Sequence, residues 1–295
     1  MKTPSTLSPA TVPAPTVSPG YWTGVWRRLS RDRVSMVCLA VIIAIVLAAL
    51  FAPLLAPADP STGSVLKRLQ PVGAPNYALG TDELGRDMLT RLLFGGRLSL
   101  IMGVVPVGLA LVIGGTLGMI AGFVGGRVNA IIMRSADVLF AFPSILLAVA
   151  IAGALGAGVA NALLALTVVF IPPIVRISES ATTQVRSLDF VEAARATGAG
   201  SLSIIREHIL GNVLGPILVY ATSLLSVSII VAAGLSFIGL GAKPPTPEWG
   251  LMLNALRSAI YTQPLIAALP GIMIFAVSLS FNLLSDGLRS AMDVQ

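Results

Sequence analysis

Long apolar runs alternate with short polar segments along this chain of 295 residues. Each run is close to the roughly 20 residues that an α-helix needs to cross the hydrocarbon core of a bilayer. The runs are continuous and do not alternate every second residue, so they predict helices and not the strands of a membrane barrel. The six predicted spans are residues 34–55, 98–122, 138–157, 159–177, 213–233 and 265–284.

The composition excludes a water-soluble protein. Mean hydropathy is +0.90, with 55% hydrophobic and 11% charged residues, whereas about a quarter of a soluble domain is charged. We therefore predict an all-α integral membrane protein in three parts. Residues 1–33 would be a disordered cytoplasmic tail with an interfacial segment, 34–97 a first span with an outer loop and an amphipathic helix, and 98–295 the core membrane domain.

Basic residues suggest the orientation of the spans. Residues 1–20 are rich in Pro, Ser, Thr and Ala, and are followed by Trp22, Trp26 and a group of arginines just before the first span. This aromatic and basic collar is typical of the cytoplasmic membrane interface. An inside N-terminus places twelve of the 19 lysines and arginines on inner segments and seven on outer ones, which favours both termini in the cytoplasm.

A second kind of pattern follows the loop over residues 56–80. Apolar residues recur at helical spacing between Thr81 and Arg97, with Thr81 placed to cap a helix and Asp82 and Asp87 near its positive end. Such an amphipathic helix either lies on the outer membrane interface or presents an ordinary solvated face.

The outer segment over residues 234–264 is rich in glycine and proline. Pro244, Pro245 and Pro247 precede Trp249, which predicts a rigid, non-helical cap over the bundle. A substrate-delivering protein would land on such a cap. The alternative is a plain connector.

Small residues recur every fourth position in the second span. This ridge allows a close approach by another helix, either as a static packing seam or as a surface that rocks during transport. The residues are Ala110, Gly114, Gly118, Gly122 and Gly126.

One short polar helix is predicted between two apolar runs, over residues 187–197. Asp189 is placed to cap it with Glu192 three residues further on, and Gly198 supplies the left-handed position that ends it. Its alanines keep its surface slim, so the helix can enter a groove on another protein. The alternative is an ordinary loop between two spans.

A charged pair marks the inner end of the third span. Arg134 and Asp137 are three residues apart, so we expect them to pair across one helical turn as an interfacial anchor.

Residue patterns for catalysis are missing from the sequence. It contains no Walker A motif, paired catalytic carboxylates, His/Cys cluster or nucleophile elbow, so we predict no enzyme activity and no metal site in this chain. Cys38 and His208 are the only residues of their kinds. The basic residues form no stripe with aromatics, which argues against nucleic acid as a partner.

Neutral polar residues lie inside the last three spans, which carry almost no ionisable side chains. The coupling ion of a secondary carrier usually needs such charges, so energy would come from a partner. The neutral residues are candidates for lining a wet translocation path, or they form interhelical hydrogen bonds of about 0.6 kcal/mol each. The candidates are Asn161, Thr167, Ser223, Ser226 and Asn282.

Four segments together resemble the second permease of the dipeptide, oligopeptide and nickel ABC importers. The triplet Glu192-Ala193-Ala194, with Gly198 and a later Ile-Leu pair, resembles the cytoplasmic signature of ABC-importer permeases. The chain departs from the family at Gly211, where the family usually has proline after Ile-Leu. The other similar segments are residues 79–87, 234–250 and 281–289.

The resemblance implies a fold and a set of partners. The fold would be the six-span type I importer permease with a cytoplasmic coupling helix, in a bacterial inner membrane. The partners would be a homologous second permease, two ATP-binding subunits that carry ATP and Mg²⁺, an extracytoplasmic substrate-binding protein and membrane lipid. No cofactor is expected in this chain, and Glu192, Ala193, Ala194 and Gly198 would couple it to the ATP-binding subunits.

The implied activity is import of dipeptides or oligopeptides, driven by ATP hydrolysis on the partners. A permease for nickel or another small solute is the alternative within the family. An exporter, a secondary carrier and a purely structural membrane subunit are the alternatives outside it.

Overall fold

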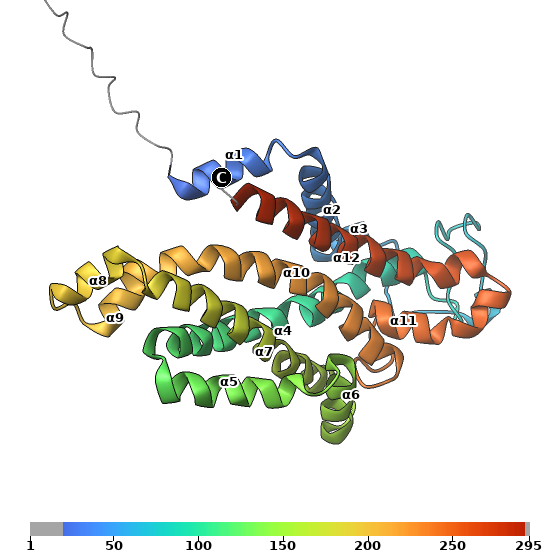
Figure 1. Ribbon diagram of the computed structural model, residues 1–295. Helices are drawn as coiled ribbons and strands as arrows, with labels where there is room; N and C mark the ends of the chain where they lie inside the picture. Colours follow the sequence, from blue (N-terminus) through green and yellow to red (C-terminus); the bar gives the residue numbers. More distant parts are fainter. Residues whose placement is uncertain (1–19, 293–295) are drawn as a thin grey trace, which may run out of the picture.

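The computed structural model of the protein describes residues 20–292, so the predicted disordered tail lies outside the described residues except for Gly20. Helices α4, α7, α10 and α12 run alongside one another as the body of the molecule (Figure 1). The long and intermediate helices are α2 (Arg33–Leu50), α4 (Met88–Val124), α5 (Gly126–Phe140), α6 (Ser144–Leu155), α7 (Val159–Arg186), α10 (Leu210–Phe237) and α12 (Pro264–Met292).

Shorter elements lie at the two ends of this body. Figure 1 places α8 and α9 at one end, and α11 with the loop before α4 at the other. The short elements are α1 (Tyr21–Leu29), α3 (Ala52–Leu55), η1 (Val65–Lys67), α8 (Asp189–Ala196), α9 (Ser201–Ile204), η2 (Ile205–Ile209), α11 (Trp249–Ala255) and η3 (Arg257–Tyr261).

The all-α membrane prediction is confirmed. Five helices are long and apolar enough to cross a membrane, and a sixth crossing results if α5 and α6 together form one span. Within residues 20–292 the only β pairs are three isolated bridges, all in the loop before α4. These bridges make no sheet.

The third span departs from the predicted residues 138–157 in its start and its shape. The chain bends by 87° between α5 and α6, and α5 begins much earlier, at Gly126. Pro143 has no N–H to donate, and its ring disfavours helical geometry at the preceding Phe142. The apolar run continues through this bend, so hydropathy alone does not mark it.

The ridge of small residues on α4 packs against α7. A Cβ added at Gly114 would lie 2.8 Å from the carbonyl oxygen of Ile171, and one at Gly122 would lie 2.7 Å from that of Glu179. At Gly118 an added Cβ would overlap the carbonyl of Val175. The two backbones therefore approach as closely as the absence of side chains permits, which confirms the predicted packing seam at Gly114, Gly118 and Gly122. Gly126 is not part of it, because it begins α5 and an added Cβ there would have nothing within 4 Å.

Helix α4 begins later, and runs further, than the sequence predicts. The Thr81 hydroxyl donates to the carbonyl of Lys67 and accepts from the N–H of Gln70 at 2.8 Å, so Thr81 caps no helix. The cap is Asp87, whose carboxylate accepts from the N–H of Thr90 at 2.7 Å. The separate amphipathic helix is therefore wrong, because α4 continues unbroken through the predicted boundary at residues 97 and 98.

The outer segment after α10 is also partly helical, in contrast to the predicted non-helical cap. The carboxylate of Glu248 accepts from the N–H groups of Gly250 at 2.9 Å and Leu251 at 2.7 Å, and so caps α11. Trp249 is fully buried, and its indole N–H donates to the carbonyl of Leu92 at 3.0 Å. This anchor on α4 holds the start of α11 in place.

A π-helical turn, η2, joins α9 to α10. It ends at Ile209, two residues before Gly211, and the amide of Asn212 donates to the carbonyl of His208 at 2.7 Å. The single histidine is half-buried, and its ring centre lies 6.2 Å from that of Phe190 in α8. A π turn in a long helix is a local departure that is frequent at functional sites.

We predict that Gly118→Ala lowers the thermal stability of the purified chain in detergent. The added methyl group must push α4 away from α7, and such overpacking typically costs about 1–3 kcal/mol. Gly108→Ala is the matched control, because Gly108 lies on the same helix with nothing within 4 Å of its added Cβ. Equal unfolding temperatures for the two variants would contradict the tight seam.

Candidate functional site

Helix α8 ends as the sequence predicts. Gly198 has a φ of 82°, in the left-handed region. Its N–H donates to the carbonyl of Arg195 at 3.0 Å, and the N–H of Ala199 donates to the carbonyl of Ala194 at 3.1 Å. These two bonds form the common helix ending that satisfies carbonyls left over in the last turn. The end of α8 is therefore fixed by local hydrogen bonds.

The beginning of α8 differs from the prediction that Asp189 caps it. The cap position is Leu188, whose carbonyl accepts from the N–H of Val191 at 2.9 Å, and no side chain caps this end. Asp189 lies one residue inside the helix because Leu188 already has the extended backbone of a cap residue. Asp189 and Glu192 both remain in the first turn, where negative charge is stabilised by the helix dipole.

One face of α8 is buried and the other is free. Val191 is fully buried in an apolar cluster formed with Phe123 of α4 and Ile204, Ile209 and Val213 of the segments that follow. Ala194 is half-buried against the same cluster. The helix is therefore attached to the bundle through one side only.

The opposite face of α8 carries small and charged side chains, with exposed apolar residues beside it. Glu192 and Ala193 are exposed, and Leu188 and Phe190 are 46% and 42% exposed. Leu202, just beyond the helix, is 79% exposed. Exposed apolar groups around a short projecting helix are typical of a protein contact surface.

Arg186, shortly before the start of α8, connects this region to the end of α4. The guanidinium of Arg186, the last residue of α7, donates to the carbonyls of Gly122 at 3.1 Å and Phe123 at 3.0 Å. The guanidinium of Arg195 lies 5.3 Å from the centre of the Phe123 ring. A displacement of α8 would therefore be transmitted to α4 and α7 together.

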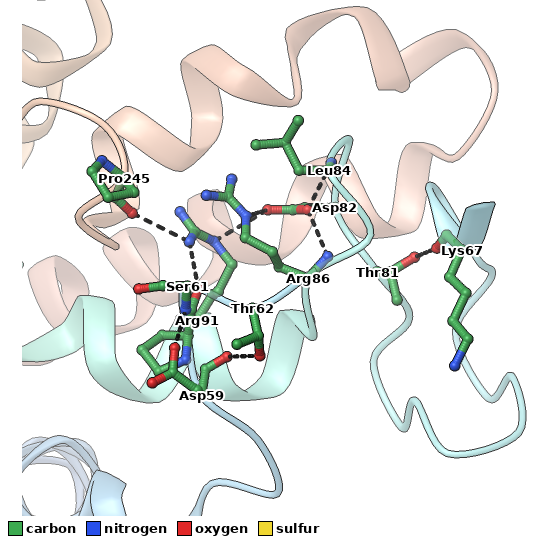
Figure 2. Close-up of polar contacts among 11 residues, drawn as sticks. Asp59, Ser61, Thr62, Lys67, Thr81, Asp82, Leu84, Arg86, Arg91 and Pro245 are labelled. Atoms are coloured by element: carbon green, nitrogen blue, oxygen red, sulfur yellow. Dashed lines mark hydrogen bonds and ion pairs between the residues drawn. The ribbon is translucent and has the colours of Figure 1, made fainter. Parts of the chain in front are cut away.

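At the opposite end of the molecule, a buried carboxylate holds two arginines (Figure 2). Asp82 lies 2.7 Å from Nε of Arg86 and 3.2 Å from Nε of Arg91, and these side chains are at most 9% exposed. The same carboxylate accepts from the N–H groups of Leu84 at 2.9 Å and Arg86 at 3.0 Å. Asp82 therefore folds its own loop into a turn, which explains why no helix begins at Thr81.

Arg91 extends this cluster to two further segments. Its Nη1 donates to the carbonyl of Pro60 at 2.9 Å and, as Figure 2 shows, to that of Pro245 at 3.4 Å. Arg91 lies in the first turn of α4, so it ties the loop before α4 and the segment before α11 to one helix. The exposed part of the predicted outer cap is thereby held in a fixed position.

The predicted path residues mostly bond to nearby backbone. The hydroxyls of Thr167, Ser223 and Ser226 donate to carbonyls three or four residues earlier, at 2.7 or 2.8 Å. Asn161 donates from its amide to the carbonyls of Leu155 and Gly156, both at 2.9 Å, and Asn282 is exposed on α12. The bond from Ser226 goes to the carbonyl of Ser223, and the role of all five residues in a path stays a prediction.

Open grooves lie along α7 and α10. They are lined in part by aromatic and charged residues that the sequence analysis did not select as site candidates. Tyr220 borders three of these grooves, one of them beside Phe140 and the Pro172-Pro173 pair. The unusual double proline in an apolar run is the sequence signal that could have drawn attention to this face.

The predicted Arg134–Asp137 pair does not form. Asp137 instead pairs with Arg176 of α7 at 2.5 Å, and the guanidinium of Arg176 lies 4.7 Å from the centre of the Phe140 ring. The closer approach of α7 decides the partner, because Arg176 can stack on Phe140 while it reaches Asp137. A three-residue spacing does not reveal this neighbour.

Comparison with known families agrees with this arrangement. The family described as the binding-protein-dependent transport system inner membrane component matches residues 114–294, which include α8. The N-terminal transmembrane domain of oligopeptide transport permease C matches residues 20–71. The chain belongs to the binding-protein-dependent transport permeases.

Individual relatives of this permease cover most of its length. The glutathione transport system permease protein of Pectobacterium atrosepticum is 41% identical over 92% of this chain and 90% of its own. The dipeptide permease of Alkalihalophilus pseudofirmus is 42% identical over 94% and 90%. The di/tripeptide permease of Pseudomonas aeruginosa is 44% identical over 75% and 73%.

A solved structure supports the fold of the permease. One chain of the inward-facing MetNI methionine ABC transporter aligns with a TM-score of 0.57 at 21% identity, covering 69% of this permease and 97% of that chain. The permease therefore has the type I ABC-importer fold, and the part of this chain outside the alignment is additional to that compact core.

We predict that Asp82→Ala loosens the outer end of the permease. The change leaves two buried guanidinium groups without their counter-charge, and breaking such a buried pair typically costs about 3–5 kcal/mol. Thermal unfolding and trypsin cleavage of the loop over residues 56–87 would report it. Asp59→Ala is the control, because within residues 20–292 the exposed carboxylate of Asp59 accepts only from the nearby N–H of Ser61, and the Asp59 carbonyl that accepts from Thr62 is retained in the variant. Equal effects of both changes would contradict the role of the cluster.

Proposed function

We propose that this permease forms part of an ATP-driven importer that moves dipeptides or oligopeptides, including small peptides such as glutathione, into the cytoplasm. The observation that carries the proposal is the 41–44% identity to relatives named for dipeptide, di/tripeptide and glutathione transport, extending over most of both chains. The exposed polar helix α8 supports an ATP-driven mechanism, because it offers a contact surface at one end of the bundle.

The chain itself would carry no catalytic step. Two partner subunits would bind ATP with Mg²⁺ and hydrolyse it, a second homologous permease would complete the path, and an extracytoplasmic binding protein would deliver the peptide. The absence of a Walker A motif from the sequence supports this division of labour.

Coupling would run through Glu192, Ala193, Ala194 and Gly198. Exposed Glu192 and Ala193 would contact the ATP-binding subunit, while Ala194 and Val191 bear on the apolar cluster that includes Phe123. Gly198 sets the angle at which α8 leaves the bundle. Closure of the ATP-binding subunits would move α8, and the apolar cluster would carry that movement into α4 and α10.

Both chain ends would face the cytoplasm together with α8. The C-terminal end of α12 and helix α1 lie at the α8 end of the molecule (Figure 1), and the Tyr21 hydroxyl lies within 3.3 Å of a Cβ built on Gly215 of α10. The loop before α4 and helix α11 would then face outward, where the binding protein arrives.

The function is tested by reconstituting the permease with its partner permease, ATP-binding subunits and binding protein in proteoliposomes. Uptake of a labelled dipeptide, glutathione or Ni²⁺ is measured with ATP and with a nonhydrolysable analogue. ATP-dependent uptake of peptide supports the proposal. Uptake of Ni²⁺ alone, or uptake that follows an ion gradient without ATP, would overturn it.

The coupling role predicts a large effect at Gly198. Gly198→Val forces a β-branched residue into the left-handed region, at a local cost of about 1–3 kcal/mol. We expect normal membrane insertion, with loss of uptake and of the ATPase stimulation by loaded binding protein.

Gly200→Val is the matched control for this change. Gly200 is exposed two residues away, and its φ of −67° suits any residue. Wild-type transport by both variants at equal expression would show that the end of α8 is only a loop.

The orientation predicts which exposed residues an impermeant thiol reagent reaches. In a Cys38→Ala background, Thr246→Cys should be labelled from outside intact cells, because Thr246 is exposed in the segment before α11. Leu202→Cys, beside α8, should be labelled only in inverted vesicles. The reverse pattern would invert the proposed topology.

A further inference from the structure

Helix α1 lies across the ends of two membrane helices. Its buried residues Val25 and Leu29 belong to an apolar cluster with Cys38 of α2 and Leu284 of α12. Nε of Arg28 donates to the carbonyl of Ala291 in the last turn of α12 at 2.7 Å. The position of α1 is therefore fixed by both packing and a hydrogen bond.

An open groove remains beside this contact, between α1, α2 and α12. Every residue that lines it is apolar or aromatic, and Trp22 and Trp26 are 49% and 56% exposed along its edge. The lining residues are Trp22, Val25, Trp26, Leu29, Leu39, Leu284, Leu288 and Met292.

Positive charge is concentrated in and just after α1, the helix that forms one wall of the groove. Arg27, Arg28, Arg31 and Arg33 lie within seven residues, all exposed, and none of them forms an ion pair within residues 20–292. Along α12 the exposed Asp286 and Arg289 offset each other. The region around the groove therefore has an excess of arginine.

The one acid in this segment, Asp32, is occupied. Its carboxylate accepts from the N–H groups of Val34 and Ser35 and from the Ser35 hydroxyl, and so caps α2. The hydrogen bond from the Ser35 hydroxyl, with help from the two N–H groups, lowers the pKa of Asp32 despite slight desolvation. Asp32 stays ionised but directs its oxygens at the start of α2.

We propose that this groove binds an acyl chain of an anionic phospholipid, with the headgroup phosphate held by Arg27 and Arg31. A hydrocarbon chain needs no hydrogen bonds from the groove, and the only side-chain donors in its lining are the indole N–H groups of Trp22 and Trp26. An extended polypeptide segment there would leave its backbone N–H and C=O groups unpaired, which is costly. The arginines complement a negative headgroup, and tryptophans at this depth are typical of the membrane interface.

The tryptophan positions allow a direct test with the full-length chain. Only three tryptophans are present; Trp22 and Trp26 border the groove, whereas Trp249 is fully buried near the other end of the molecule. We would reconstitute the chain in phosphatidylcholine nanodiscs and add phosphatidylglycerol or phosphatidylcholine with brominated acyl chains. Bromine quenches tryptophan fluorescence on contact. We expect stronger quenching by brominated phosphatidylglycerol at equal lipid fraction.

Charge variants separate a headgroup site from general solvation by lipid. Arg27→Gln with Arg31→Gln should weaken the apparent affinity for brominated phosphatidylglycerol on the order of tenfold, while quenching by brominated phosphatidylcholine is unchanged. Arg28 is left intact because it holds α12. Arg127→Gln with Arg134→Gln is the matched control, since both arginines are exposed on α5 and lie away from the groove.

The outcomes decide the occupant of the groove independently of which solute is transported. Selective quenching that is lost in the Arg27/Arg31 variant and retained in the control supports the proposal. Equal quenching by both lipids in the wild type, or an equal loss in the control, would overturn a specific site. Absence of quenching by either lipid would also overturn it, and would mean that another protein segment covers the groove.

Discussion

The close backbone contact between α4 and α7 is the constraint on which the rest of the structure depends. In hydrocarbon, helices gain little by hiding apolar side chains from lipid, so they associate through van der Waals contact and hydrogen bonds. Gly114, Gly118 and Gly122 remove the side chains that would separate the two backbones. The seam fixes where α7 ends. Only because of this can Arg186 reach the final carbonyls of α4 and can Val191 enter the cluster beside Phe123.

Features set by neighbours in the sequence were predicted well. Apolar runs identified most of the membrane helices, and the end of α8 at Gly198 followed from hydrogen bonds that span only a few residues. The same is true of the small-residue ridge, because a period of four puts its members on one helix face. Whether α8 performs the coupling that its sequence suggests stays a prediction.

Features set by distant partners were not predictable in this way. Asp82 would have been a good first-turn residue, but Arg86 and Arg91 draw it into a turn. Asp137 lies near Arg134 in sequence yet pairs with Arg176 from another helix. The polarity of a residue was also not enough to place it on the translocation path. A hydroxyl such as that of Thr167 can donate to a carbonyl one turn earlier in its own helix and need not face water. In each case the competing partner comes from the tertiary structure.

Helix α4 connects the two ends of the molecule. Arg91 in its first turn holds the outer loops, and its last residues contact Arg186 and the cluster below α8; its 37 residues correspond to about 55 Å. Pro106 is the single proline within it. Both ends of the molecule therefore contact the same helix, and a contact at one end that favours one position of α4 also affects the contacts of α4 at the other end. Thermodynamic linkage then requires reciprocity: if binding at the outer loops changes the affinity at the α8 end by some factor, binding at the α8 end changes the affinity at the outer loops by the same factor.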